Sequence, residues 1–336
     1  MTVLGLARAG PYPVIDGLLE AIALSALELG MTSRRVFEAT DEASVDVMLY
    51  VGDPRSYRGF LPAYRSSRRI AWFGEMLPRS GVGDTRTTRV AKGPAAAGLP
   101  IARAILGPLT RRALPAPLAI WREELAIATA RFANLDHARW CAGLVDRVVV
   151  TSRDRGQILG DHGLETRVVP FGYHPSEAGV IVAPGIGERD IAVAVVGNGL
   201  TVGPGRRARI LAGLVPAIER LGPVVLVEGA WGPARDAILH RTRIVLDVQN
   251  AAGNFGGLRF LTTLAAGAVL VTDTIDDPFP FEAGVDHIEA PVDGLVAAIA
   301  ALLDDEPRRR SIVAAGQARL LGDLSMRCSL ERVLAA

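Results

Sequence analysis

Short apolar runs alternate with helical segments along most of the chain, and this alternation restricts the fold more than any other feature. Strands are expected in the first half at Val3–Leu6, Arg35–Glu38, Asp46–Val51, Arg69–Phe73, Arg147–Thr151 and Thr166–Pro170. They are expected in the second half at Ile191–Val196, Val224–Val227, Ile244–Val248, Ala268–Thr272 and His287–Glu289. A run such as Ile191–Val196 is apolar throughout, which indicates burial on both faces of a parallel sheet. Two such arrays predict an α/β protein with two facing, doubly wound Rossmann-like domains.

The domain boundaries follow from the same pattern. The chain has 336 residues, which favours two domains over one core. Residues 1–173 form the predicted N-terminal domain, and 174–190, which lack periodicity and contain Pro184, form the connection. Residues 191–322 form the predicted second domain, and 323–336 a final helix. Because ligands of such sheets bind at the carboxyl ends of the strands, we expect the functional site in the cleft between the domains.

The composition excludes several classes of protein. With 49% hydrophobic and 22% charged residues the chain is expected to fold, and its net charge of +1 favours neither nucleic acid nor an anionic membrane as partner. Cys141 and Cys328 fit no metal or disulfide spacing. No apolar run approaches the roughly 18 residues of a membrane helix, and the N-terminus reads as a strand rather than a signal peptide. We therefore expect a soluble, cytoplasmic protein.

The stretch from Asn254 to Asp273 is typical of a phosphate site. It reads as a glycine turn at Gly256 and Gly257, a helix, a second glycine at Gly267 and a buried strand. The turn lets the backbone approach a ligand, and the unpaired N–H groups of the helix start, together with the helix dipole, favour phosphate.

The second half of the chain resembles glycosyltransferases of the GT-B type, and within them the CgeB-like group associated with spore maturation. The resemblance is carried by the block from Val248 to Asp273 and by four further segments. These are Asp146–Ser152 with Ile158–Gly160, Val168–Pro175, Val195–Asn198 with Arg206 and Arg207, and Met326–Leu334. The resemblance implies transfer of a sugar from a nucleoside-diphosphate donor, bound by the C-terminal domain, to an acceptor hydroxyl bound by the N-terminal domain. It also implies that the last helix returns to the N-terminal domain.

One departure from that family concerns the donor sugar and the ribose. Many relatives carry Glu-x7-Glu around the glycine turn, and the matching positions here are Asn254 and Thr262. Both can still form hydrogen bonds, although each bond is weaker than a charge-assisted one by about 1 kcal/mol. The rest of the predicted donor site consists of residues at strand ends and helix starts: Gly197, Asn198, Arg206, Glu228, Trp231, Phe255, Gly256, Gly257, Leu258 and Arg259. The arginines are expected to hold the diphosphate, Glu228 the ribose, and Trp231 to stack on the base.

Transfer with inversion needs a base near the acceptor hydroxyl. Glu75, which follows the strand ending at Phe73, is the first candidate, and Asp16 near the first helix start is the second. Tyr12, His137 and His174 complete the predicted acceptor side.

No metal or other cofactor is expected, because the spacing of Asp273, Asp276 and Asp277 does not match a metal motif of sugar transferases, and a solvated loop is the better interpretation. The predicted reaction moves a hexose from a donor such as UDP-glucose to a small-molecule acceptor, for example a nucleoside or another secondary metabolite. Two alternatives stay open. Gly197–Gly203 imitates a dinucleotide fingerprint, which would suit an NAD(P)-dependent enzyme, and the missing carboxylates would suit a silent nucleotide-sugar-binding protein.

Overall fold

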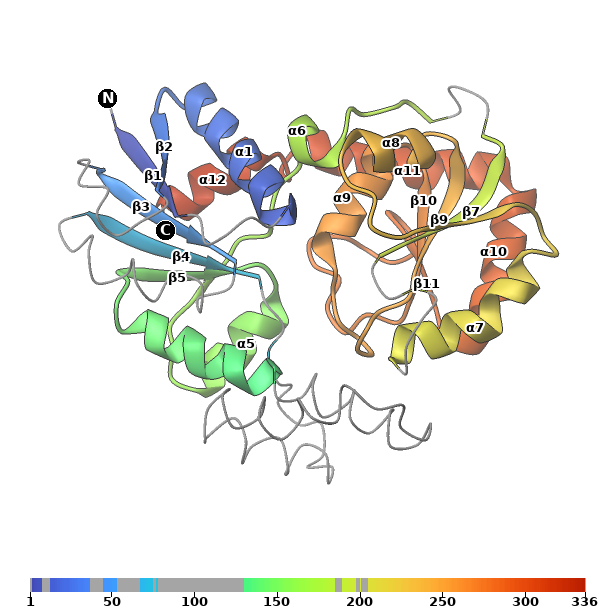
Figure 1. The fold of residues 1–336 in the computed structure, drawn as a ribbon, viewed down its shortest axis with the longest axis horizontal. Helices are drawn as coiled ribbons and strands as arrows, with labels where there is room; N and C mark the ends of the chain where they lie inside the picture. The colour runs from blue at the N-terminus through green and yellow to red at the C-terminus, as the bar shows by residue number, and fades with distance from the viewer. Residues whose placement is uncertain are drawn as a thin grey trace. The chain divides into compact units, whose positions relative to one another are not determined.

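The structure, a computed structural model, describes residues 2–7, 13–36, 45–52, 67–74, 77, 130–184, 189–197, 200 and 205–335. The chain divides into two compact units, each with one parallel sheet (Figure 1). One unit comprises residues 2–10 and 34–168, and the other comprises residues 11–33 and 169–335. The predicted α/β class with two Rossmann-like sheets is confirmed.

The first sheet contains six strands in the order β2-β1-β3-β4-β5-β6. The strands are β1 Val3–Ala7, β2 Thr32–Val36, β3 Val47–Val51, β4 Arg68–Phe73, β5 Arg147–Val150 and β6 Arg167–Val168. Their buried side chains, among them Tyr50, Phe73 and Val150, meet a helical stretch at residues 130–142 and helix α5 (Arg153–Asp161). Strand β2 begins three residues earlier than predicted, because the preceding helix ends at Glu28 and Gly30 turns the chain at a φ of 73°.

The second sheet contains five parallel strands in the order β11-β10-β9-β7-β8. The strands are β7 Ile191–Val196, β8 Val224–Val227, β9 Thr242–Asp247, β10 Val269–Asp273 and β11 Ile288–Ala290. The register pairs Val193 of β7 with Ile244 of β9, and Ile244 with Val269 of β10. Every residue of β10 is buried, as expected for a central strand covered on both faces.

Helices cover both faces of this second sheet (Figure 1). Side chains of α8 (Pro233–Leu239) and α9 (Gly257–Ala265) form one core, and those of α7 (Arg206–Ile218) and α10 (Leu295–Asp304) form the other. A 3-10 turn, η3 (Val292–Gly294), precedes α10, and α11 (Glu306–Leu321) contributes to both cores. The sequence did not predict α8, whose seven residues are too few to establish a helical period.

Helix α1 (Pro13–Glu28) contacts α12 (Met326–Ala335) and the short helix α6 (Pro175–Ala178). The chain before α6 also pairs with the chain before α12, since the Tyr173 amide donates to the Leu324 carbonyl and the Met326 amide donates to the Tyr173 carbonyl, both at 2.7 Å. A side chain at Gly172 would overlap the backbone of Ser325. These contacts place α1, α6 and α12 in the same compact unit as the second sheet.

Candidate donor-binding site

A pocket of about 180 Å³ opens at the carboxyl ends of β7, β8 and β9. Five residues of the predicted donor site line it: Gly197, Trp231, Leu258, Arg259 and Thr262. Arg207, Asn250, Arg235 and Glu177 also contribute to its wall. Helix α9 begins here at Gly257, directly after the glycine turn from which the sequence predicted the helix start.

Two arginines of the pocket share one buried carboxylate. Asp247, the last residue of β9, is fully buried. Its Oδ2 accepts a hydrogen bond from Arg259 Nε at 2.7 Å, and its Oδ1 lies 3.8 Å from Arg207 Nη2. Burial, and then the neighbouring charge of Arg259, lower the pKa of Arg207 to about 10. The carboxylate therefore holds two guanidinium groups at the pocket wall that would otherwise repel each other.

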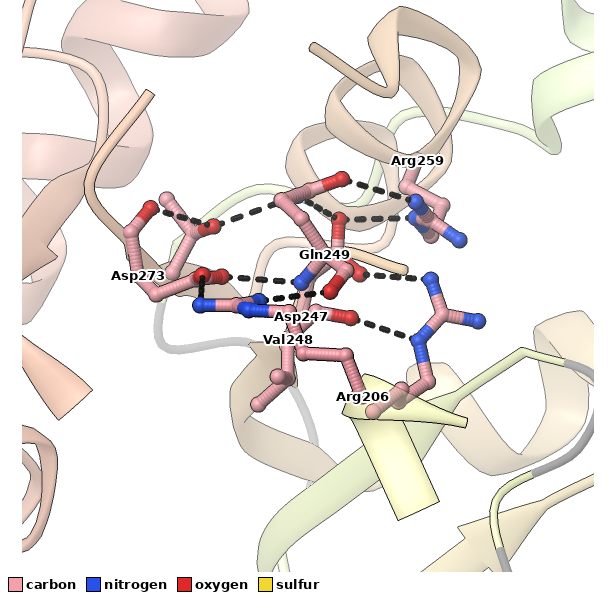
Figure 2. Close-up of polar contacts among 8 residues, drawn as sticks. Arg206, Asp247, Val248, Gln249, Arg259 and Asp273 are labelled. Carbon is pink, nitrogen blue, oxygen red and sulfur yellow. Dashed lines mark hydrogen bonds and ion pairs between the residues drawn. The ribbon is translucent and has the colours of Figure 1, made fainter. Parts of the chain in front are cut away.

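A second buried carboxylate holds Arg206 beside this pair (Figure 2). Asp273 ends β10, is 2% exposed, and pairs with Arg206 Nη2 at 2.7 Å. Gln249 joins the two carboxylates, because its backbone N–H donates to Asp273 at 2.8 Å and its side-chain Nε2 donates to Asp247 at 2.7 Å. The interpretation of Asp273 as part of a solvated loop is wrong, since the residue belongs to a strand and its charge is neutralised in the interior.

Glycines make room for the arginines. A Cβ at Gly256 would lie 2.6 Å from Arg259 Nη2, and one at Gly197 would lie 2.7 Å from Arg207 Nη1. Gly256 in the glycine turn therefore lets the guanidinium group of Arg259 fold back over the start of its own helix. Three guanidinium groups against two carboxylates leave one positive charge in excess, which favours an anionic ligand.

Trp231 and Thr262 supply groups of a different kind. Trp231 is 41% exposed and lines the pocket, a position from which an indole can stack on a flat ring. The Thr262 hydroxyl donates to the Arg259 carbonyl at 3.2 Å and keeps its lone pairs as acceptors.

Glu177 brings helix α1 to the pocket. It lies on α6, lines the pocket, and packs so closely against Gly17 of α1 that a side chain at Gly17 would overlap its carboxylate. Burial raises the pKa of Glu177 to about 7, although Arg235 lowers it. Asp16, the second candidate base, precedes Gly17 in the first turns of α1 and is therefore adjacent in sequence to this contact.

Several predicted donor residues lie outside the pocket wall. Phe255 is 8% exposed and packs edge-on against Phe260 at 5.1 Å between ring centroids, so it belongs to the core below the turn. Asn254 is half-buried in the turn, where its amide donates to the Ala251 carbonyl. Glu228 is exposed, and its carboxylate accepts from the Leu200 amide at 3.4 Å. None of these three lines the pocket as the structure describes it.

The predicted acceptor residues are distributed over both units. His174 caps α6, since its Nδ1 accepts from the Ser176 amide at 3.2 Å, and burial lowers its pKa. His137 is half-buried in the helical stretch of the first unit, whereas Asp16 and His174 belong to the second. Tyr12, Glu75 and Asn198 lie outside the described residues.

Sequence reasoning missed Asp247 and Gln249, the two residues that connect the arginines. Asp247 ends the buried strand β9, and Gln249 follows it with only Val248 between them. The acidic residue at the end of a buried strand was the signal that could have identified this pair. The described ranges contain no gathering of three or more His, Cys, Asp or Glu side chains suited to a metal ion. They also contain no helix with both the length and the apolar character needed to span a membrane.

Part of the chain matches a family of known proteins. Residues 206–335 match the family described as glycosyl transferase-like, and this range contains α9 and most of the pocket. No curated protein matches the chain by sequence. The family match indicates a glycosyl transferase-like domain over residues 206–335.

Solved structures show the same architecture at low sequence identity. Anabaena HepE, determined with UDP and glucose, has a TM-score of 0.61 at 10% identity, with 100% of this chain and 99% of that one covered. Sucrose-phosphate synthase from Thermosynechococcus elongatus has a TM-score of 0.57 at 10% identity, with 100% and 98% covered. TarM of S. aureus has a TM-score of 0.54 at 12% identity; 86% of this chain is covered, and the chain spans 54% of TarM.

Proposed function

We propose that the protein transfers a hexose from a UDP-sugar to a hydroxyl of a small-molecule acceptor, in the manner of CgeB-like glycosyltransferases, in the cytoplasm and without a metal ion. The main support for the proposal is the pocket at the start of α9, where the buried carboxylate of Asp247 contacts both Arg207 and Arg259. Anabaena HepE, which shares the fold, has been determined with UDP-glucose. In this proposal the nucleotide base of the donor stacks on the indole ring of Trp231, and the ribose of the donor contacts Thr262.

The chemistry follows from where charge develops. When the bond between the sugar and the diphosphate breaks, negative charge grows on the diphosphate oxygens. Preorganised donors at that position stabilise the transition state more than the ground state. The N–H groups at the start of α9 and the guanidinium group of Arg259 are such donors, and Asp247 keeps Arg259 in place before the reaction. We assign to Glu75 or to Asp16 the role of the base that removes the proton from the acceptor hydroxyl.

A thermal-shift panel tests the donor class. UDP, UDP-glucose, GDP, dTDP, NAD and NADP are compared, and a ligand at one hundred times its dissociation constant adds about 2.7 kcal/mol of stability. We expect UDP and UDP-glucose to raise the melting temperature and NAD and NADP to leave it unchanged. Stabilisation by NAD or NADP alone would favour the alternative site at Gly197–Gly203.

Two arginine variants distinguish specific binding of the diphosphate from a general effect of positive charge. Arg259→Gln removes a pocket guanidinium and is expected to abolish most of the UDP-induced shift, measured against the melting temperature of that variant without ligand. Arg209→Gln is the matched control, because Arg209 is exposed on α7 and lies outside the pocket wall. Equal loss in both variants would contradict the proposed diphosphate site.

Release of UDP from UDP-glucose in the presence of a nucleoside panel separates an enzyme from a silent binding protein. We expect Glu75→Gln or Asp16→Asn to lose turnover while the UDP-induced thermal shift remains. A wild-type protein that binds UDP but never releases it from UDP-glucose with any acceptor would favour the binding protein.

A further inference from the structure

A second, larger pocket of about 410 Å³ lies at the opposite, amino-terminal edge of the same sheet. Four arginines line it: Arg189 before β7, Arg243 in β9, and Arg309 and Arg310 on α11. Asp304 and Glu306 are the acidic residues of the wall. The pocket shares no lining residue with the donor-binding pocket.

The guanidinium groups of this pocket are held almost entirely by neutral carbonyls. Arg189 donates to the carbonyls of Thr242 and, at 2.8 Å, of Ala266. Arg243 Nε donates to the Arg189 carbonyl at 2.8 Å, and Arg309 donates to the carbonyls of Leu302 and, at 2.7 Å, of Leu303. Within the described ranges, Arg310 alone of the four has an ion pair, with Glu306 at 2.5 Å. Carbonyls fix the positions of the side chains without cancelling their charge.

The arginines consequently destabilise one another. Burial and then the charge of Arg309 lower the pKa of Arg189. Burial and then the charge of Arg243 lower the pKa of Arg309, although Glu306 and Asp305 raise it. Arg189 Nε is buried and has no hydrogen-bond partner among the described residues. Four guanidinium groups against two carboxylates leave two positive charges in excess. Partly buried charges of one sign are stabilised by a counter-ion.

Gly267 leaves free the space that the Arg189 side chain occupies. The glycine has a φ of 74°, and a Cβ there would lie 2.5 Å from Arg189 Nη2 and 2.7 Å from the Val182 carbonyl. The second glycine of the Asn254–Asp273 block therefore belongs to this pocket, not to the donor site.

We propose that the arginine pocket binds a small dianion, either inorganic phosphate or the phosphate group of a small metabolite. Its volume falls within the roughly 300–1,000 Å³ of small-molecule sites, and guanidinium groups match phosphate oxygens in pairs. Because the pocket lies at the edge of the sheet opposite the donor site and shares no lining residue with it, the dianion binds apart from the donor.

Isothermal titration with inorganic phosphate and with glucose 6-phosphate tests the proposal at low ionic strength. The variant Arg243→Gln/Arg310→Gln removes two exposed guanidinium groups without disturbing the carbonyl contacts of Arg309. Arg327→Gln is the matched control, because Arg327 makes the same i,i+4 ion pair with Glu331 on an exposed helix face away from the pocket. A third variant, Arg259→Gln, reports on phosphate bound in the donor pocket.

We expect the double variant to weaken binding by about tenfold or more, as loss of charge-assisted hydrogen bonds predicts. Arg327→Gln should bind as the wild type does, and binding to the arginine pocket should persist when Arg259→Gln removes the contribution of the donor pocket. Tighter binding of glucose 6-phosphate than of phosphate would identify a metabolite as the ligand. The proposal is overturned if the double variant binds unchanged, if the wild type binds neither probe, or if only Arg259→Gln loses binding. Should the double variant melt well below the wild type, Arg310→Gln alone against Arg327→Gln gives the same comparison.

Discussion

Arginines gather at both edges of the second sheet, but their partners differ. At the carboxyl edge, Arg206, Arg207 and Arg259 meet the buried carboxylates Asp247 and Asp273. Arg206 and Arg207 donate to backbone carbonyls as well. At the amino-terminal edge, Arg189 and Arg309 donate to carbonyls and have, among the described residues, no ion pair. The comparison separates two uses of one side chain: a carboxylate lowers the local charge and fixes geometry, whereas carbonyls fix geometry and leave the charge available to a ligand.

The carboxyl edge should be the more sensitive to loss of an acid. Asp247→Ala leaves Arg207, which is 3% exposed, without its counter-charge, and breaking a buried ion pair in this way costs about 3–5 kcal/mol. Asp304→Ala at the amino-terminal edge is the matched control; because Asp304 is exposed, we expect a change within about 0.5 kcal/mol. Urea unfolding measures both, and similar values for the two variants would contradict the distinction between the edges.

A glycine-to-alanine pair tests the packing around Arg189. Gly267→Ala adds left-handed strain of about 1–2 kcal/mol and an overlap with the backbone of Val182, so we expect a loss of about 3 kcal/mol in stability. Gly284→Ala is the control, since Gly284 has a φ of 83° with no atom within 4 Å of the added Cβ; it should lose only the strain, about 1–2 kcal/mol. Thermal unfolding measures both, and equal losses would show that Arg189 and Val182 move aside without cost.

The sequence predicted the strands of the second sheet closely, because each is a short apolar run between polar turns. Strands β7 and β8 have the predicted bounds, and β9 and β10 deviate by two residues or fewer. Helix α9 and its glycine turn were also predicted, since glycine and helical period both leave local signals. The short helices α6 and α8 left none, because four and seven residues span too few turns.

The site was predictable only in part, for a physical reason. Arg206, Arg259 and Trp231 could be proposed because each follows a predicted turn or strand end. The role of Asp247 could not, since a buried acid becomes acceptable only through partners 12 and 40 residues away in sequence, Arg259 and Arg207. Phe255 looked like a ligand contact from its place beside the turn, and only the packing of Phe260 and Phe281 shows that it faces the core.

The smallest effect concerns Glu177, an acid of the carboxyl edge. Arg235 Nη2 donates to the backbone carbonyl of Glu177 at 2.7 Å, and burial raises the pKa of the carboxyl from 4.5 to about 7. A raised pKa means that the folded state binds the proton more tightly than the unfolded state does. The stability that the neutral carboxyl contributes is therefore complete below pH 4.5 and is lost as the pH rises through about 7.

Glu177→Gln removes this dependence, because glutamine stays neutral. The free energy of unfolding of the variant should equal that of the wild type near pH 4 and exceed it by about 2 kcal/mol at pH 8, after allowance for partial exposure. Glu306→Gln, an exposed acid of the amino-terminal edge, is the control and should stay within about 0.5 kcal/mol at both pH values. Urea titrations at pH 4, 6 and 8 measure the difference; a difference that does not grow with pH would mean that water reaches the Glu177 carboxylate.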